Sequence, residues 1–248
     1  MGPFWGQYGT FLADVDGDHK ADAIGVGSNY IGVLRSNGNG FGAYETWKGN
    51  FAFVGDYGNY FADVDGDHKV DAIAVYATHI DVMRSNGNGF GAPETWKSNT
   101  VFYGQIGTFF VDVDGINGAD AVAIDSGYIK VMLSNGTNGF GDIVYWNAFP
   151  FHGSHGTYMA DVDGDGKADA VGVGDNYIGV LRSNGGGFNG YETWKSNFPF
   201  YGNSATMFAD VDGDGKADAV GLSPNLVAVM RSNGNGFGAY ESWYSQGY

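Results

Sequence analysis

The chain lacks cysteine, and among its 248 residues 12 lysines and arginines stand against 28 aspartates and glutamates. Without cysteine there are no disulfides, thiol nucleophiles or thiolate zinc sites. The net charge of −16 repels phosphate groups, so nucleic acids and anionic membrane surfaces are poor partners. No apolar run approaches the roughly 20 residues of a membrane span, which argues against membrane insertion, and no charged-then-apolar leader opens the chain.

Helical signals are also missing, because no window combines a 3.6-residue apolar period with helix caps. Glycine is abundant instead, at 44 residues, and 43% of the chain is hydrophobic. Such a composition predicts a folded protein that is rich in tight turns and poor in helix.

One unit is repeated along the chain. The motif Asp-Val-Asp-Gly begins every 49 residues, at Asp14, Asp63, Asp112, Asp161 and Asp210. The repeats, at approximately 4–50, 51–99, 100–148, 149–197 and 198–248, fill nearly the whole chain. We therefore expect a single domain over residues 1–248.

Each unit shows the pattern of four short strands. In the first unit these are residues 9–15, 21–27, 30–36 and 43–48, with a hairpin signal at Asn37-Gly38. Repeated at about 49 residues per blade, the pattern predicts an all-β fold, a five-bladed β-propeller of four-stranded antiparallel blades. An open solenoid, or fewer blades completed by oligomerisation, are alternatives that leave more sheet edges to cover. We expect every blade to be formed by contiguous chain.

An acidic loop of nine residues begins at the first aspartate of each Asp-Val-Asp-Gly motif. Four of the five loops have aspartates at positions 1, 3, 5 and 9. Alternating carboxylates on a turning loop can direct several hard oxygens at one Ca²⁺ ion, and the carbonyl at position 7 would add another. The predicted metal ligands are Asp14, Asp16, Asp18, Lys20 and Asp22; Asp63, Asp65, Asp67, Lys69 and Asp71; Asp112, Asp114 and Asp120; Asp161, Asp163, Asp165, Lys167 and Asp169; and Asp210, Asp212, Asp214, Lys216 and Asp218.

These loops hold 19 of the 28 acidic residues, so the charge is clustered rather than spread. Clustered carboxylates repel one another unless a cation lies among them, which favours calcium over metal-free aspartate turns. Ile116 replaces the third acid of the third loop. We therefore expect four structural calcium sites and a weak or empty fifth at 112–120.

The segments Ala-Asp-Val-Asp-Gly-Asp-Gly-Lys-Ala-Asp-Ala (160–170 and 209–219) and Ser-Asn-Gly-Asn-Gly-Phe-Gly (232–238) resemble the FG-GAP/VCBS repeat. That repeat builds the calcium-binding propeller of integrin α-chains, and the units are also similar to the blades of Psathyrella-type fungal and bacterial propeller lectins. The resemblance implies a secreted or extracellular carbohydrate-binding protein with pockets between blades, for N-acetylglucosamine, fucose or sialylated glycans. The class hosts several functions, so a protein-interaction propeller is a second possibility.

Two sets of aromatic residues are candidates for sugar binding. The first is the tryptophan near the end of each unit, at Trp47, Trp96, Trp146 and Trp194, which either stacks on a sugar or packs between blades; packing is favoured, because the residue is kept in every copy.

The second set lies in the segments that join one blade to the next. There a phenylalanine and a glycine stay fixed while aromatic, histidine and small polar residues vary around them. Such side chains either recognise a sugar or reflect tolerated variation on a surface loop. The candidates are Trp5, Tyr8, Tyr57, Tyr103, His152, His155 and Tyr201.

The arginine that precedes Ser-Asn-Gly, as in Arg35, either contacts a glycan or pairs with a residue such as Glu45, and the second is favoured. No nucleophile elbow, phosphate-binding loop or zinc-protease helix is found, and the acids recur as metal ligands would. The sequence therefore predicts a non-catalytic, multivalent lectin, with N-acetylglucosamine-type sugars favoured. The alternatives are a calcium-stabilised protein-interaction propeller and an engineered repeat protein with no selected ligand.

Overall fold

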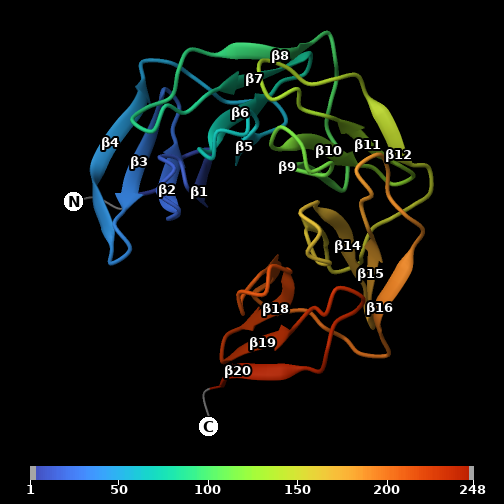
Figure 1. Cartoon of the computed structure of the whole chain (residues 1–248). Coiled ribbons are helices and arrows are strands. Elements are labelled where there is room, and N and C mark those ends of the chain that lie inside the picture. The colour runs from blue at the N-terminus through green and yellow to red at the C-terminus, as the bar shows by residue number, and fades with distance from the viewer. Residues whose placement is uncertain (1–3, 246–248) are drawn as a thin grey trace. The chain divides into compact units, whose positions relative to one another are not determined.

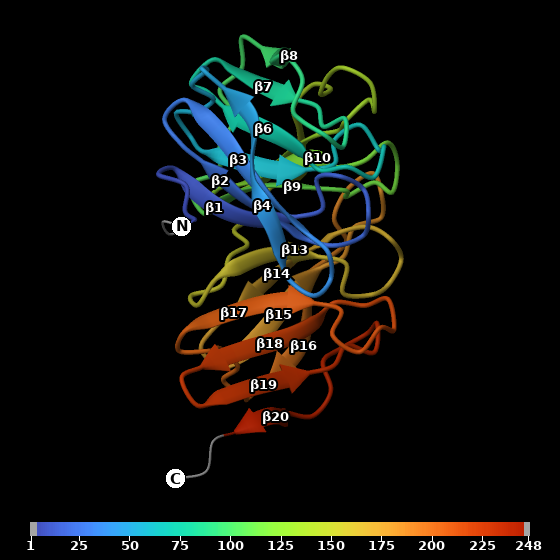
Figure 2. The ribbon, with the colours of Figure 1, turned by 90° about the vertical axis from the view of Figure 1, so that its left-hand side faces the viewer.

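The computed structural model describes residues 4–245, which form twenty strands in five four-stranded sheets (Figure 1). Each sheet consists of four consecutive strands, each paired with its neighbours along the chain, as Figure 2 shows for β17 to β20. The predictions of an all-β fold, of a five-bladed propeller and of contiguous blades are confirmed. Within the described residues there is no helix long and apolar enough to cross a membrane.

The strands take the same four places in every blade. First strands are β1 (Gly9–Ala13), β5 (Asn59–Ala62), β9 (Gly107–Val111), β13 (Thr157–Ala160) and β17 (Ala205–Ala209). Second strands are β2 (Asp22–Val26), β6 (Asp71–Val75), β10 (Asp120–Ile124), β14 (Asp169–Val173) and β18 (Asp218–Ser223). Third strands are β3 (Tyr30–Ser36), β7 (His79–Met83), β11 (Ile129–Met132), β15 (Tyr177–Leu181) and β19 (Leu226–Met230). Fourth strands are β4 (Phe41–Gly49), β8 (Glu94–Ser98), β12 (Val144–Asn147), β16 (Glu192–Ser196) and β20 (Glu241–Ser245).

The second strand is the most buried element of each blade. In β2, β6, β10 and β14 every residue is buried, because neighbouring strands cover both edges and packed side chains cover both faces. This explains why their sequences, such as Asp-Ala-Ile-Ala-Val in β6, are almost continuously apolar after the first aspartate. The second strand thus holds the loops at its two ends in fixed positions.

The chain divides into two compact units. One contains Met1–Tyr103, Ile116–Ala121 and Met132–Ile143, and the other contains Gly104–Gly115, Val122–Val131 and Val144–Tyr248. A core around Val15, Trp47 and Phe90 lies in the first unit, and one around Val162, Trp194 and Phe237 lies in the second. The extent of the domain, residues 1–248, stays a prediction.

Hydrogen bonds within each unit join one blade to the next at the acidic loops. The residue at loop position 8 donates its N–H to the carbonyl at position 1 of the preceding loop, as Val70 does to Asp14 at 2.9 Å and Ala217 to Asp161 at 2.7 Å. The serine of Ser-Asn-Gly donates its hydroxyl to position 2 of the preceding loop, and Ser85 reaches Val15 at 2.5 Å. Adjacent blades are therefore joined by hydrogen bonds to backbone carbonyls of the acidic loops.

Candidate functional site

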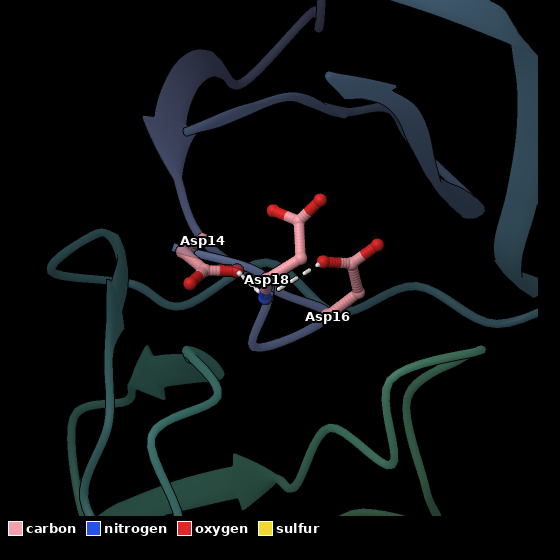
Figure 3. A group of neighbouring side chains, drawn as sticks. All are labelled: Asp14, Asp16 and Asp18. Carbon is pink, nitrogen blue, oxygen red and sulfur yellow. Dashed lines mark hydrogen bonds between the residues drawn. The ribbon is translucent and has the colours of Figure 1, made fainter. Parts of the chain in front are cut away.

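The acidic loop is folded around its first aspartate. The Asp14 carboxylate accepts the N–H groups of Gly17 and Asp18 on Oδ1, at 2.7 and 3.2 Å, and that of His19 on Oδ2, at 2.7 Å. Figure 3 shows Asp14 and Asp16 converging on the backbone nitrogen of Asp18. The alternating acids are thereby held on one side of a tight loop.

The loop turns at position 6, where the backbone enters the left-handed region. His19, His68 and Asn117 have φ values of 64°, 66° and 65° there, and the fourth and fifth loops have Gly166 and Gly215 instead. Side chains other than glycine are strained in this conformation. The residue type at position 6 varies because the loop requires a left-handed backbone there and no particular side chain.

In each of the four loops that lie within one compact unit, three carboxylates come close enough to share a cation. Their oxygen atoms lie within 4.8 Å of one another in the groups Asp14, Asp16 and Asp18; Asp63, Asp65 and Asp71; Asp161, Asp163 and Asp169; and Asp210, Asp212 and Asp218. The donor set is all hard oxygen, which fits calcium better than zinc or copper.

The aspartate at position 9 begins the second strand and is fully buried. Both Asp71 oxygens accept backbone N–H groups, from Val64 at 3.1 Å and Ser85 at 2.8 Å. The pKa of Asp71 and of Asp169 is raised to about 7, mainly by burial and also by the other loop carboxylates, although the N–H groups lower it. A bound cation would remove this penalty, so the residues fit a metal site.

Position 5 is less uniform than the sequence predicts. Asp18 belongs to the first cluster, whereas Asp67, Asp165 and Asp214 lie outside the other three. The lysine at position 7 binds this aspartate, as in Lys69 Nζ to Asp67 Oδ2 at 2.8 Å, and Lys216 to Asp214 at 2.9 Å. The acids at positions 1 and 3 are therefore the constant part of the clusters, and ligation by position 5 and by the lysine carbonyls stays a prediction.

The third loop is divided between the two compact units. Asp112 Oδ1 accepts the N–H groups of Asp114 and Gly115, at 3.2 and 2.6 Å, as its counterparts do. Asp120 is buried and accepts the N–H of Ser134 at 2.7 Å. Ile116, at position 5, is exposed and supplies no oxygen from its side chain.

Beside each complete loop, an arginine links the loop to the outer strand. Arg35 binds Glu45 at 3.0 Å and lies 3.8 Å from Asp16, while Glu45 accepts the indole N–H of Trp47 at 3.0 Å. The same arginine–glutamate pair forms at Arg84, Arg182 and Arg231. The favoured prediction, that this arginine pairs with glutamate, is confirmed.

Trp47, Trp96 and Trp194 are buried, and Trp146 is half-buried. Each contacts a phenylalanine of the following blade, as Trp47 contacts Phe90 with ring centroids 5.3 Å apart at 63°. Trp47, Trp96 and Trp194 therefore offer no open face to a sugar, which corrects the stacking hypothesis for them. The packing alternative describes all four.

The connecting segments lie at the opposite end of the first strand from the acidic loops. Their phenylalanine is buried, as in Phe53 and Phe102, and their glycine lies against the second strand. A Cβ atom on Gly55 would come within 2.6 Å of the backbone of Val75 and Gly58, so no other residue fits there. The N–H of Tyr57 binds the Val75 carbonyl at 2.9 Å. The fixed residues thus anchor the segment and leave its variable residues at the surface.

At two junctions, variable residues of successive connecting segments form aromatic pairs. Tyr57 stacks on Tyr103, with ring centroids 4.2 Å apart at 22°, and His155 stacks on Tyr201 at 3.7 Å and 11°. Each pair joins the sixth residue of one segment to the third residue of the next. Polar groups lie beside the second pair, since Asp175 accepts from Ser154 at 3.1 Å and lies 2.9 Å from His155 Nε2.

The other candidates in these segments, Trp5, Tyr8 and His152, are exposed, and no ring contact is seen for them within the described residues. The sequence indicated which residues of the connecting segments vary. It did not show that the sixth residue of one segment contacts the third residue of the next. That pairing follows from the packing of adjacent blades.

Residues 161–221, which include the fourth and fifth acidic loops, match the FG-GAP-like repeat family. This confirms the resemblance that the sequence suggested, and no curated protein matches the chain.

Two solved structures have a similar fold. A lectin of Agrocybe aegerita, described as specifically recognising non-reducing terminal N-acetylglucosamine, is 26% identical, with a TM-score of 0.76. The alignment covers 96% of this chain and 66% of the lectin, so this chain spans just under two thirds of that relative. The Photorhabdus luminescens Tc holotoxin pore is 19% identical with a TM-score of 0.64, covering 92% of this chain and 11% of that one, which shows the fold alone.

Proposed function

We propose that this FG-GAP-like repeat protein is a non-catalytic, multivalent lectin stabilised by calcium. The stacked pairs Tyr57–Tyr103 and His155–Tyr201 carry the proposal, because they place aromatic and polar groups together where two blades meet. Aromatic faces bind the apolar face of a sugar, while adjacent carboxylate and hydroxyl groups bind its hydroxyls. The similarity to the Agrocybe aegerita lectin supports N-acetylglucosamine-type glycans as ligands.

Multivalency follows from the repeat. The two junctions with an aromatic pair, Tyr57–Tyr103 and His155–Tyr201, each offer one weak site, and two or more weak sites on one scaffold bind a glycan-coated surface by avidity. Calcium has a structural part in this proposal, since the acidic loops and the aromatic pairs lie at opposite ends of short strands. A calcium-loaded lectin of this kind would act in the extracellular space, where calcium is at millimolar concentration.

The test is a glycan array with the calcium-loaded protein, followed by titration of the best sugar into two variants. Tyr57→Ala and Tyr201→Ala each remove one ring of a pair, and each should weaken binding severalfold on a multivalent surface. Tyr145→Ala is the matched control, because Tyr145 is an exposed tyrosine on the outer strand β12, away from the connecting segments.

Binding to a related set of glycans, weakened severalfold in the two variants and unchanged in the control, supports the lectin. A blank array with a folded, calcium-loaded protein contradicts it, and would favour a calcium-stabilised protein-interaction propeller.

A further inference from the structure

The four acidic loops with an aspartate at position 5 each carry a positive charge of their own, on the lysine at position 7. In the second loop, Lys69 binds both oxygens of the Asp67 carboxylate: its backbone N–H donates to Oδ1 at 2.9 Å and its ammonium group to Oδ2 at 2.8 Å. The other three loops make the same two contacts, Lys20 to Asp18 at 3.0 and 2.6 Å, Lys167 to Asp165 at 3.0 and 2.6 Å, and Lys216 to Asp214 at 2.9 and 2.9 Å. The acid at position 5 is thus bound on both oxygens by one lysine.

Packing of the lysine stem holds this ammonium group in place. A Cβ atom on Gly17, at position 4 of the preceding loop, would lie 3.2 Å from Lys69 Cγ, and one on Gly87 would lie 3.6 Å from Lys69 Cδ. The stems of Lys167 and Lys216 lie in the same way against Gly115 and Gly164 of their preceding loops. These three side chains are only 28%, 19% and 25% exposed. The contact with position 5 is therefore made by a packed side chain, unlike most surface ion pairs.

The position-5 carboxylate also faces the place where a cation would bind. In the first loop Asp18 belongs to the cluster with Asp14 and Asp16, which Figure 3 shows, while its Oδ2 atom lies 2.6 Å from Lys20 Nζ. One carboxylate is therefore shared between the metal-binding cluster and the lysine. A second positive charge on the same carboxylate is opposed by the first.

The acid at position 5 and the lysine at position 7 occur together along the chain. Four loops have both residues, and the third loop has neither, since Ile116 and Gly118 take their places. A lysine that only joined neighbouring loops would have no reason to be lost together with the acid. The two residues therefore act as a pair.

We infer that the lysine at position 7 is a built-in cation that competes with calcium for the position-5 carboxylate and so keeps the calcium affinity of its loop low. The inference rests on the proposed calcium sites and adds the residue that sets their affinity. Calcium affinity in such loops is tuned by the charge of the ligand set, and the lysine reduces that charge by one. The same lysine neutralises part of the loop when calcium is scarce, so it stabilises the calcium-free protein.

The experiment measures calcium binding to the whole chain by competition with a chromophoric chelator, which resolves two classes of site. Lys69→Met with Lys167→Met keeps the aliphatic stems and removes the ammonium groups of two loops. Two sites should then bind calcium about tenfold more tightly, as expected for the loss of one charge near the ion. Lys48→Met with Lys195→Met is the control, because these ammonium groups bind backbone carbonyls outside the acidic loops. The control removes the same charge and should bind calcium as the original chain does.

The outcomes separate this inference from the calcium sites themselves. An unchanged number of bound ions with unchanged affinities in Lys69→Met with Lys167→Met overturns the role of the lysine and leaves the calcium sites standing. Equal tightening in the control shows an effect of net charge alone, and also overturns it. An original chain that binds no calcium overturns both the calcium sites and the inference.

Thermal unfolding gives a second measurement, with a variant that keeps the charge. Lys69→Arg with Lys167→Arg retains a cation beside each position-5 acid, so in EGTA it should melt at a higher temperature than Lys69→Met with Lys167→Met. Saturating calcium should raise the Tm of the methionine variant by more than that of the arginine variant, because its sites bind more tightly. Equal Tm values in EGTA, or equal gains on adding calcium, would contradict competition between the lysine and the metal.

Discussion

Ser183 donates its hydroxyl hydrogen to the carbonyl oxygen of Val113, a residue 70 positions earlier, at 2.5 Å. The bond is buried, and Ser85, Ser134 and Ser232 make the equivalent bond. A single side chain thus satisfies the backbone of the preceding blade at a place where water has no access. This predicts that Ser183→Ala lowers the free energy of unfolding by about 1–3 kcal/mol, the cost of leaving a buried carbonyl unpaired.

Urea denaturation of Ser183→Ala at low protein concentration measures this loss. Ser196→Ala is the control, since Ser196 is an exposed serine of β16 in the same blade, and the stability of this variant should change little. Equal losses in the two variants would contradict a role for the hydroxyl in joining blades.

The left-handed backbone at position 6 predicts that glycine is better there than histidine. His19→Gly and His68→Gly relieve strain at φ near 65° and should each stabilise the protein by up to about 1 kcal/mol. Gly166→Ala is the reverse test: φ is +86° and no atom lies within 4 Å of an added Cβ, so the backbone alone should cost about 1 kcal/mol. Thermal unfolding of all three variants checks the sign, and a stabilising Gly166→Ala would refute the interpretation.

Calcium removal should destabilise the protein markedly. At millimolar calcium and a dissociation constant near 0.1 mM, each site adds on the order of 1.5 kcal/mol, and four such sites rival the net stability of a domain. Chelation with EGTA should therefore lower the Tm substantially, while an equal excess of EGTA already saturated with calcium should not. An unchanged melting curve would count against calcium in the acidic loops.

The third loop allows a test of stoichiometry. Ile116→Asp restores the missing acid at position 5, and calorimetric titration should then find about one more calcium ion per chain. Ile116→Asn is a control of similar polarity with no added charge, and should raise the number less. No increase with Ile116→Asp would show that position 5 does not decide whether this loop binds.

The raised pKa values of Asp71 and Asp169 give the calcium-free protein a pH dependence of definite sign. These buried carboxyls hold a proton up to about pH 7 in the folded chain, whereas the ordinary pKa is 3.8. Their contribution to stability is therefore full below pH 3.8 and is lost as the pH rises through 7. In EGTA the Tm should be higher at pH 5.5 than at pH 8.

Calcium should reverse that order, because the metal binds the deprotonated carboxylate. The stabilisation gained on adding calcium should therefore be larger at pH 8 than at pH 5.5. Asp71→Asn should flatten the calcium-free profile. A calcium-free Tm that rises from pH 5.5 to pH 8 would contradict the assignment.

Local patterns in the sequence predicted most of the fold. The expected strand at 30–36 is β3 (Tyr30–Ser36), and the expected strand at 9–15 is two residues shorter as β1. The acidic loop and the pairing of Arg35 with Glu45 were also predictable, since each depends on residues within one repeat.

What the sequence could not show depends on neighbouring blades. Trp194 is buried because Phe237 of the following blade packs on it, and nothing in its own repeat shows that contact. The stacking of Tyr57 on Tyr103 likewise depends on how two blades pack, and no spacing within one repeat encodes it.

Each aromatic pair is formed by residues of two successive connecting segments. The Tyr57–Tyr103 pair takes the sixth residue of one segment and the third residue of the next, and the His155–Tyr201 pair is formed in the same way. One substitution therefore changes half of a single site and leaves the adjacent site intact. Gene duplication of such a unit yields copies whose binding preferences can diverge one junction at a time, on a scaffold held by its phenylalanine and glycine.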